Sequence, residues 1–227
     1  MANKNDIVVE KKFIYEGINY SFYGIENEHI FKQIPWYEYD LLQYLKSLNK
    51  TGVYVDVGGN IGNHSIFFLN HCASTKLFVF EPEELCYDIL EKNLIHNVNK
   101  EYVLQKSAVW NKRTKLNLTK FESLNNMGMS KVSENIDGKN MINADSLDNL
   151  ISFGENIVLI KIDAEGSECK VLEGALNLIK LNNPLLICEA ATDTEFKNIN
   201  NILLPLGYKQ PIRRFNATAT YVWEINN

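Results

Sequence analysis

The sequence has few cysteines, few prolines and no excess of positive charge. Its 227 residues include four cysteines and five prolines, and the formal net charge is −5. Because affinity for a nucleic-acid backbone comes mainly from Lys and Arg, this charge predicts no nucleic-acid partner and favours a neutral or weakly charged substrate. The cysteines form no C-x-x-C pair, which predicts free thiols in a reducing compartment. They are Cys72, Cys86, Cys169 and Cys188.

The chain also has no long apolar run, and we expect no secretory leader. Residues 1–12, MANKNDIVVEKK, lack an apolar core, and no stretch approaches the roughly 18 apolar residues of a membrane span. Hydrophobic residues make up 45% of the chain, which is enough for one full-sized core. We therefore expect a single soluble, cytoplasmic domain over residues 1–227, with no membrane span.

Short apolar runs alternate with helical patterns along most of the chain. This alternation predicts parallel strands joined by right-handed crossovers, and so a doubly wound α/β fold. Two strand-like runs near the C-terminus, 208–213 and 220–225, predict a terminal antiparallel hairpin. The predicted parallel strands are 53–57, 77–80, 102–104, 158–162 and 185–188, and the predicted helices are 61–71, 85–96, 168–181 and 195–204.

Two segments fall outside this alternation. Residues 1–50 form an N-terminal extension, in which we expect a short hairpin over 13–31 and a helix over 36–48 that Pro35 opens. Residues 112–144 are polar, and only 115–119 has a strand-like pattern. We predict a hairpin plus a mobile insertion there, on the substrate side.

Glycines gather where the first parallel strand turns into a helix, in Tyr54-Val-Asp-Val-Gly-Gly-Asn-Ile-Gly62. Glycine lets the backbone approach a ligand closely, and the following helix offers unpaired N–H groups. The dinucleotide fingerprint G-x-G-x-x-G would need glycine at Asn60, which disfavours an oxidoreductase. The carboxylate of Asp56 would repel phosphate but suits a ligand that carries an ammonium and a sulfonium. Asp56, Gly58, Asn60 and Gly62 are therefore the first cofactor-binding candidates.

Further cofactor-binding candidates follow the next two strands. Glu81, in Phe80-Glu81-Pro82, can accept two hydrogen bonds from vicinal ribose hydroxyls, as an acid does in nucleoside sites of doubly wound folds. The alternative is a solvated acid at a strand end. Ser107 and Ala108 follow the third strand and would lie along an adenine by position alone.

The glycine loop belongs to a set of motifs that spans about residues 54 to 189. They are Asp56-Val-Gly-Gly-Asn-Ile-Gly62, Phe80-Glu81-Pro82, Ser146-Leu-Asp148, Lys161-Ile-Asp-Ala-Glu-Gly-Ser-Glu168 and Lys170-Val-Leu-Glu-Gly-Ala175. In this order and spacing the set resembles the FkbM family of methyltransferases. Gly59 stands where alanine is commoner in the family, which costs little beyond backbone entropy.

The resemblance implies a class I methyltransferase fold, Rossmann-like with a mostly parallel seven-stranded sheet, and S-adenosyl-L-methionine as the cofactor. It also implies O-methylation of a hydroxyl, often on a sugar of a glycan or glycoconjugate. The acceptor is then a small molecule or a glycan. The N-terminal segment and the 112–144 insertion have no counterpart in the family pattern, so we expect them to set the choice of substrate. Nothing in the sequence specifies an oligomeric state.

Acidic residues end the fourth and fifth parallel strands. Ligands of open α/β sheets lie outside the carboxyl ends of the strands, where Asp163 and Glu189 are expected. Methyl transfer to oxygen requires an aligned acceptor and removal of its proton, so Asp163 is the first candidate for the base. Glu189 would orient the acceptor or share the proton. Lys161 shares a strand face with Asp163 and would keep it ionised or steady the developing alkoxide.

Other roles for these residues stay open. Two carboxylates could instead bind magnesium or manganese, but without a third obvious ligand no metal site is assigned. Glu165 and Glu168 could start the next helix, since acids are favoured in a first turn. His64 could edge the pocket or be structural.

Aromatic and basic residues outside the motifs have both a functional and a structural interpretation. Trp36, Tyr37 and Tyr39 could roof the cofactor or stack on a sugar, or they could simply pack on the sheet. Arg213 and Arg214 could meet an anionic acceptor or be solvated.

Two rival functions remain. One is an N-methyltransferase acting on a macromolecule, which the acidic balance and Ile162-Asp163-Ala164-Glu165, in place of an N-P-P-Y type run, disfavour. The other is a non-catalytic module that binds S-adenosylmethionine, which the intact Asp163 and Glu189 disfavour.

Overall fold

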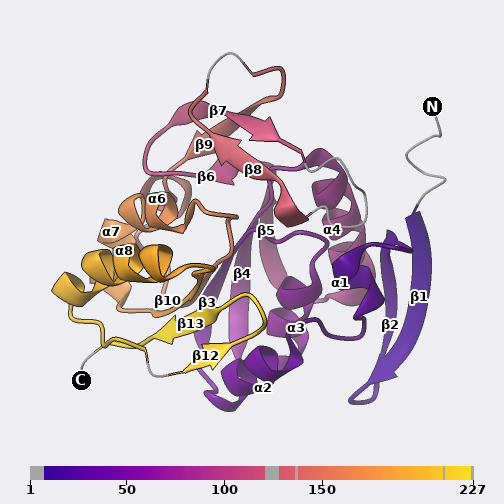
Figure 1. Ribbon diagram of the computed structural model, residues 1–227. Coiled ribbons are helices and arrows are strands. Elements are labelled where there is room, and N and C mark those ends of the chain that lie inside the picture. The colour runs from indigo at the N-terminus through magenta and orange to yellow at the C-terminus, as the bar shows by residue number, and fades with distance from the viewer. Residues whose placement is uncertain (1–7, 121–127, 136–137, 212, 226–227) are drawn as a thin grey trace.

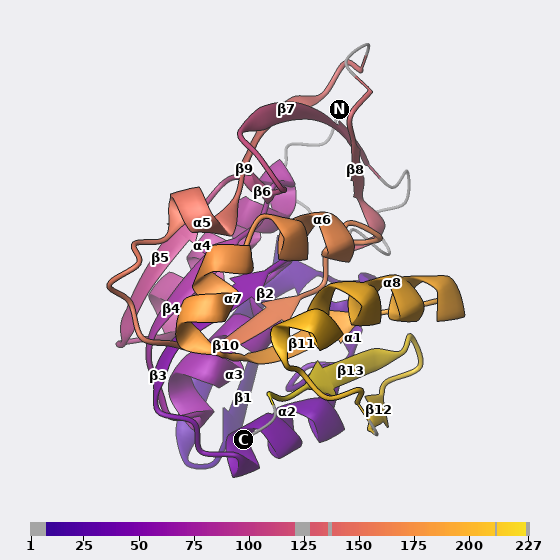
Figure 2. The same cartoon turned by 90° about the vertical axis from the view of Figure 1, so that its left-hand side faces the viewer.

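The computed structural model describes residues 8–120, 128–135, 138–211 and 213–225. A twisted sheet runs through the centre, with helices on both faces and a smaller sheet standing apart from it (Figures 1 and 2). The elements of the central sheet are β3 (Gly52–Val57), β4 (Ser74–Phe80), β5 (Glu101–Gln105), β10 (Ile157–Ile162), β11 (Leu185–Glu189), β12 (Arg214–Phe215) and β13 (Thr220–Trp223).

The order of strands in the central sheet is β12-β13-β11-β10-β3-β4-β5. The five strands from β11 to β5 pair in parallel, while β13 pairs antiparallel with both β11 and β12. This arrangement confirms the predicted doubly wound, mostly parallel seven-stranded sheet with a terminal antiparallel hairpin. Part of the predicted hairpin was misplaced. Its first strand is Arg214–Phe215, and Tyr208 makes only an isolated bridge to Ile225.

The two faces of the central sheet carry separate hydrophobic cores because side chains alternate along each strand. Tyr54 of β3 packs in one core with helices α2 (Tyr39–Ser47), α3 (Asn63–His71) and α4 (Glu84–Asn97). Val53, Val55 and Val57 pack in the other core, with α6 (Glu168–Glu173), α7 (Leu176–Asn182) and α8 (Asp193–Leu203). Every residue of β3 is buried, as expected of a strand covered on both sides.

The predicted single helix over 168–181 is two helices, α6 and α7, separated at Gly174. A Cβ atom at Gly174 would collide with the backbone carbonyl of Trp110. Glycine therefore lets the chain end α6 against the segment that follows β6 (Ala108–Val109), an approach that no larger residue would permit.

The N-terminal extension is a hairpin of β1 (Val8–Tyr15) and β2 (Ile18–Ile25), followed by α1 (His29–Lys32) and α2. The hairpin packs on α4, where the side-chain oxygen of Asn93 accepts a hydrogen bond from Tyr23 N at 2.6 Å. The predicted helix over 36–48 begins later, at Tyr39, because Glu38 has a left-handed backbone with φ 57°. Trp36, expected inside that helix, instead packs edge-on against Phe13 and Tyr20.

The insertion contributes most of the smaller sheet. Strands β6, β9 (Met141–Asp145), β7 (Thr114–Thr119) and β8 (Lys131–Ser133) pair in that order. Only β7 was predicted, because β8 is short and β9 is half exposed, so neither has an apolar alternation. Residues 121–127 and 136–137 of the predicted mobile segment lie outside the described residues. A short helix, α5 (Leu147–Leu150), returns the chain to β10. No helix in the described part of the chain has the length and apolar character to cross a bilayer.

Candidate active site

A cavity of about 390 Å³ opens where β3, β4, β5, β10 and β11 end. This is the edge at which ligands of open α/β sheets bind, and the volume is within the range of small-molecule sites. The cavity brings together these predicted site residues: Gly58, Asn60, Glu81, Ser107, Ala108, Lys161, Asp163 and Glu189. Asp56 and Gly62 are not among the described residues that line it.

The glycine loop follows β3 and bends sharply toward β4. Gly58 has φ 81°, and a Cβ atom there would collide with the backbone carbonyl of Asp163. The N–H groups of Gly58 and Gly59 both donate to the carbonyl of Phe80, at 2.9 and 3.1 Å. These bonds hold the loop against the end of β4, with Gly58, Gly59 and Asn60 at the cavity wall.

Gly62 lies behind the loop, at the start of α3, with φ 92°. A Cβ atom on Gly62 would lie 2.6 Å from Cδ1 of Leu90 in α4. The glycine therefore allows α3 and α4 to pack closely. The cofactor contact predicted for Gly62 stays a prediction, and Gly62 itself does not line the cavity.

Asp56 is fully buried beneath the loop. One carboxylate oxygen accepts a hydrogen bond from Ser65 Oγ at 2.6 Å, and the other lies 3.2 Å from Lys161 Nζ. The chain itself thus neutralises the charge that was expected to face an ammonium or a sulfonium. The cofactor contact predicted for Asp56 likewise stays a prediction, and in this structure Asp56 contacts Ser65 and Lys161.

Glu81 lies at the cavity wall and is only 6% exposed. Its two carboxylate oxygens each accept one backbone hydrogen bond at 2.8 Å, from Asn60 N and from Glu83 N. Burial raises the pKa of Glu81 to about 7, although the two backbone donors pull it down. Each oxygen keeps a second lone pair for a ligand hydroxyl.

Asn60 is the polar tip of the glycine loop. Its backbone is left-handed, with φ 47°, and its buried Oδ1 atom has no hydrogen-bond partner among the described residues. A buried amide oxygen without a partner is costly, which suggests a ligand donor at this position. Ser107 Oγ, farther along the wall, donates to the carbonyl of Ala108 at 2.9 Å.

Lys161 joins the loop to the catalytic candidates. Its buried ammonium lies 3.2 Å from Asp56 Oδ1, 3.3 Å from the carbonyl of Gly58 and 3.5 Å from Asp163 Oδ2. Burial acts to lower the pKa of Lys161, but the charges of Asp56 and Asp163 outweigh it and raise the pKa. The lysine is therefore a permanent cation between the two aspartates.

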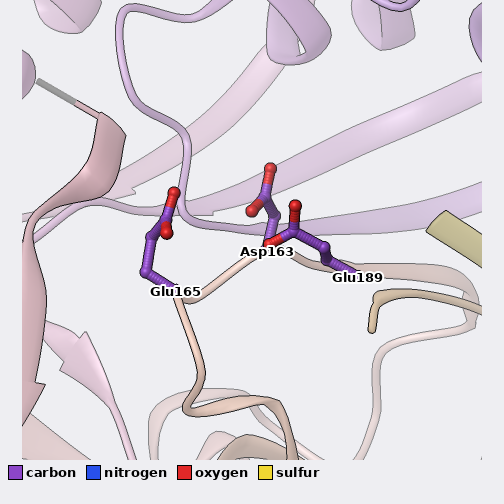
Figure 3. A group of neighbouring side chains, drawn as sticks. All are labelled: Asp163, Glu165 and Glu189. Atoms are coloured by element: carbon purple, nitrogen blue, oxygen red, sulfur yellow. The ribbon is translucent and has the colours of Figure 1, made fainter. Parts of the chain in front are cut away.

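Three carboxylates gather at one end of the cavity, on Asp163, Glu165 and Glu189 (Figure 3). One oxygen from each lies within 4.8 Å of the others. Burial, followed by the charge of Asp163, raises the pKa of Glu165 to about 7 and that of Glu189 to about 8. The structure thus adds Glu165 to Asp163 and Glu189, the pair predicted from the ends of the strands.

Glu168 has a structural role in the same segment. Its side chain is buried, and Oε1 accepts hydrogen bonds from Ala164 N at 3.0 Å and Gly166 N at 3.2 Å. These bonds fold the turn between β10 and α6, in which Glu165 has φ 51°. Glu168 thereby supports the position from which Glu165 reaches the cluster.

One cavity residue, Glu38, was missed by the sequence motifs. Its side chain is 10% exposed, and its Oε2 atom lies 3.4 Å from Nε2 of His64, a buried residue that also lines the cavity. The Tyr37 ring stacks on His64 with centroids 6.1 Å apart. Burial, then the charge of Asp163, raises the pKa of Glu38 to about 7, while burial lowers that of His64. Nothing local in the sequence marked Glu38, because its neighbours in space come from distant segments.

Comparison with known proteins identifies the family. The profile described as "Methyltransferase FkbM domain" matches residues 56–210, which is more than half of the chain. The chain belongs to the FkbM methyltransferase family. Within this family match lie Asp56, the glycine loop, Glu81 and the acidic cluster, whereas Glu38 precedes it.

Individual relatives cover the chain less completely. Methyltransferase sdnD of Sordaria araneosa is 33% identical over 78 residues, which cover 34% of this chain and 29% of that protein. The crystal structure of methyltransferase FkbM from Methylobacillus flagellatus KT has a TM-score of 0.57 and 17% identity, and the match covers 77% of this chain and 43% of that one. This chain thus matches less than half the length of either protein.

The fold is shared more widely. A Streptococcus pneumoniae protein described as a candidate tRNA (m1A22) methyltransferase has a TM-score of 0.52 at 15% identity. That match covers 82% of this chain and 70% of the other. At these identities the solved structures show a common Rossmann-like methyltransferase fold, and the acceptor has to be argued from the site.

Proposed function

We propose that this FkbM-family chain transfers a methyl group from S-adenosyl-L-methionine to a hydroxyl, on a sugar of a glycan or glycoconjugate. The observation that carries the proposal is that a single cavity joins the glycine loop and Glu81 to the carboxylates of Asp163 and Glu189. A cofactor site and a proton-accepting group thus share one space. The family match supports methyl transfer as the reaction.

The loop side of the cavity suits the cofactor. The carboxylate of Glu81 has lone pairs left for ribose hydroxyls, and the unpartnered Oδ1 atom of Asn60 offers an acceptor for an N–H or O–H group. Gly58 lines the same side of the cavity, and Ser107 and Ala108 extend it. The cofactor supplies a methyl group bound to a positively charged sulfur, which departs with the electron pair of the broken bond.

The acidic end of the cavity suits an acceptor hydroxyl. Asp163 Oδ2 lies 3.5 Å from the ammonium of Lys161, at the cavity wall, where a carboxylate is placed to take the hydroxyl proton. As the acceptor oxygen bonds to the methyl carbon, its proton passes to Asp163. Lys161 stabilises negative charge that develops on that oxygen. Sugar hydroxyls match an acidic wall because each can donate to a carboxylate.

A divalent cation is a second use for the acidic cluster. Carboxylate oxygens are the ligands that magnesium and manganese prefer, and Asp163, Glu165 and Glu189 offer three within 4.8 Å of one another. Such an ion would lower the pKa of a bound hydroxyl and replace the carboxylate as the activating group. Activity that survives EDTA would remove this version of the mechanism and leave Asp163 as the base.

The decisive experiment is a calorimetric titration of the purified protein with S-adenosylhomocysteine, with NAD as the control ligand and with or without magnesium. We expect binding of S-adenosylhomocysteine alone, followed by methylation of sugar acceptors detected by mass spectrometry. Binding without turnover on any sugar, protein or nucleic acid offered would favour a non-catalytic binding module. Methylation of RNA or protein instead of sugars would favour an N-methyltransferase.

A further inference from the structure

A second, more open hollow of about 600 Å³ lies beside the active-site cavity. It is bounded by the start of α2 and by the terminal hairpin at β12, which lie next to each other in both ribbon views (Figures 1 and 2). Glu38 lines both spaces. A molecule whose hydroxyl enters the active-site cavity past Glu38 would therefore extend into this hollow.

Two arginines of the hairpin segment line the hollow. The guanidinium of Arg213 lies 4.8 Å from the centre of the Tyr44 ring, and Arg214 Nη2 donates to the carbonyl of Ala217 at 3.0 Å. Among the described residues, the ion pairs involve neither arginine. Both cations are thus held in place by neutral groups and keep donors for a ligand.

The start of α2 adds further hydrogen-bond donors. Glu38 occupies the N-cap position, but its side chain makes no capping hydrogen bond, so the first N–H groups of this nine-residue helix lack a side-chain acceptor. Trp36 also borders the hollow and is only 5% exposed. The indole Nε1 of Trp36 has no hydrogen-bond partner among the described residues. Such an unpaired buried donor costs free energy that an acceptor oxygen would recover.

The carboxylates at this end of the hollow are fewer than the hydrogen-bond donors. The Glu38 carboxylate lies against His64, in the active-site cavity. Asp40 is an exposed acid in the first turn of α2 and lines the hollow, so it opposes the two arginines. The two guanidinium groups, the helix N-terminus and the indole outnumber the two carboxylates that line the hollow, Glu38 and Asp40, and favour an anion.

We propose that this hollow binds an oxyanion, a phosphate group in particular, carried by the acceptor next to the saccharide that is methylated. That the anion belongs to the methyl acceptor rests on the proposed function, whereas the binding of the anion itself does not depend on methyl transfer. Planar guanidinium forks suit phosphate oxygens, and the arginines come from a terminal hairpin that the family match, residues 56–210, does not include. The hollow would thereby select phosphorylated acceptors over neutral ones.

The test uses inorganic pyrophosphate as the probe, titrated calorimetrically into the full chain saturated with S-adenosylhomocysteine. Loss of the arginine charges in the Arg213→Gln, Arg214→Gln double variant should weaken pyrophosphate binding by about tenfold or more, because charge-assisted hydrogen bonds are lost. The matched control is Lys180→Gln, an exposed cation of α7 that does not line the hollow. Asp40→Asn should tighten binding because it removes the opposing charge.

Equal affinity in the wild type and the double variant would overturn the proposal, as would weaker binding in Asp40→Asn or no binding by the wild type. The affinity for S-adenosylhomocysteine, measured on the same samples, separates this proposal from the proposed function. A chain that binds S-adenosylhomocysteine but not pyrophosphate would keep its methyltransferase assignment and lose the phosphate site. A chain that binds pyrophosphate but not S-adenosylhomocysteine would keep the phosphate site and lose the proposed cofactor site.

Discussion

The ammonium of Lys161 lies between two aspartates, 3.2 Å from Asp56 and 3.5 Å from Asp163. The first partner is fully buried beneath the glycine loop, whereas the side chain of the second is 34% exposed and faces the cavity. One lysine thus contacts both a buried carboxylate of the fold and a carboxylate of the proposed active site.

Lys161→Met should destabilise the fold. It removes the only cation near Asp56 among the described groups and leaves a buried carboxylate without charge compensation, which costs about 3–5 kcal/mol. Urea denaturation, monitored by circular dichroism, measures the loss in the free energy of unfolding. The double variant Lys161→Met, Asp56→Asn should recover a large part of it, because no buried charge is then left unpaired. A double variant as unstable as the single one would contradict this account.

Glu81→Ala should weaken binding of S-adenosylhomocysteine. Charge-assisted hydrogen bonds contribute about 1.5–3 kcal/mol each, so the affinity should fall by roughly tenfold to a hundredfold for each ribose bond lost. Calorimetry on the wild type and the variant gives the ratio. Glu91→Ala, an exposed acid of α4, is the control. Equal affinities of the wild type and Glu81→Ala would remove the ribose role.

The motif residues could be predicted because their signals are local. A buried strand that ends in a glycine turn places Gly58 and Asn60 at the carboxyl edge of a parallel sheet, and Glu81 ends the neighbouring strand. The fold followed from the same alternation of strand and helix. The burial of Asp56 could not be predicted in this way, because its ion-pair partner lies 105 residues farther along the chain.

The remaining site residues depend on tertiary contacts. Glu38 reaches the cavity because its left-handed backbone ends a segment tied to α3, where Asn63 accepts a hydrogen bond from Tyr37 N, 26 residues away. Glu165 joins the cluster because Glu168 folds the turn around it. Positive φ at a glutamate is uncommon, and sequence patterns favour glycine or asparagine there. For this reason the sequence pattern indicated the beginning of a helix, rather than a left-handed turn, at both Glu38 and Glu165.

Glu189 should make the fold less stable as the pH rises. Its folded-state pKa, raised to about 8 by burial and by the charge of Asp163, exceeds the ordinary value of 4.5. Between these values the folded state holds a proton that the unfolded state has lost, so the free energy of unfolding falls as the pH rises from about 4.5 to about 8. Glu189→Gln should therefore stabilise the protein above pH 8, on the order of 1 kcal/mol after solvent screening, and have little effect near pH 4.5. Urea titrations at the two pH values measure the difference, and an equal effect at both would contradict the raised pKa.

Asp163→Asn should slow methyl transfer without weakening cofactor binding. The amide cannot take the hydroxyl proton, and loss of a general base typically lowers the rate about 10²- to 10⁴-fold. Asparagine keeps the size of the side chain, so the fold and the affinity for S-adenosylhomocysteine should stay near the wild-type values. Single-turnover measurements with an accepted sugar report the chemical step, and Asp88→Asn, an exposed acid of α4, is the matched control. If Asp163→Asn lost rate only through a higher KM, the carboxylate would bind the acceptor rather than take its proton, and the role of base would pass to Glu189, its neighbour in the cluster.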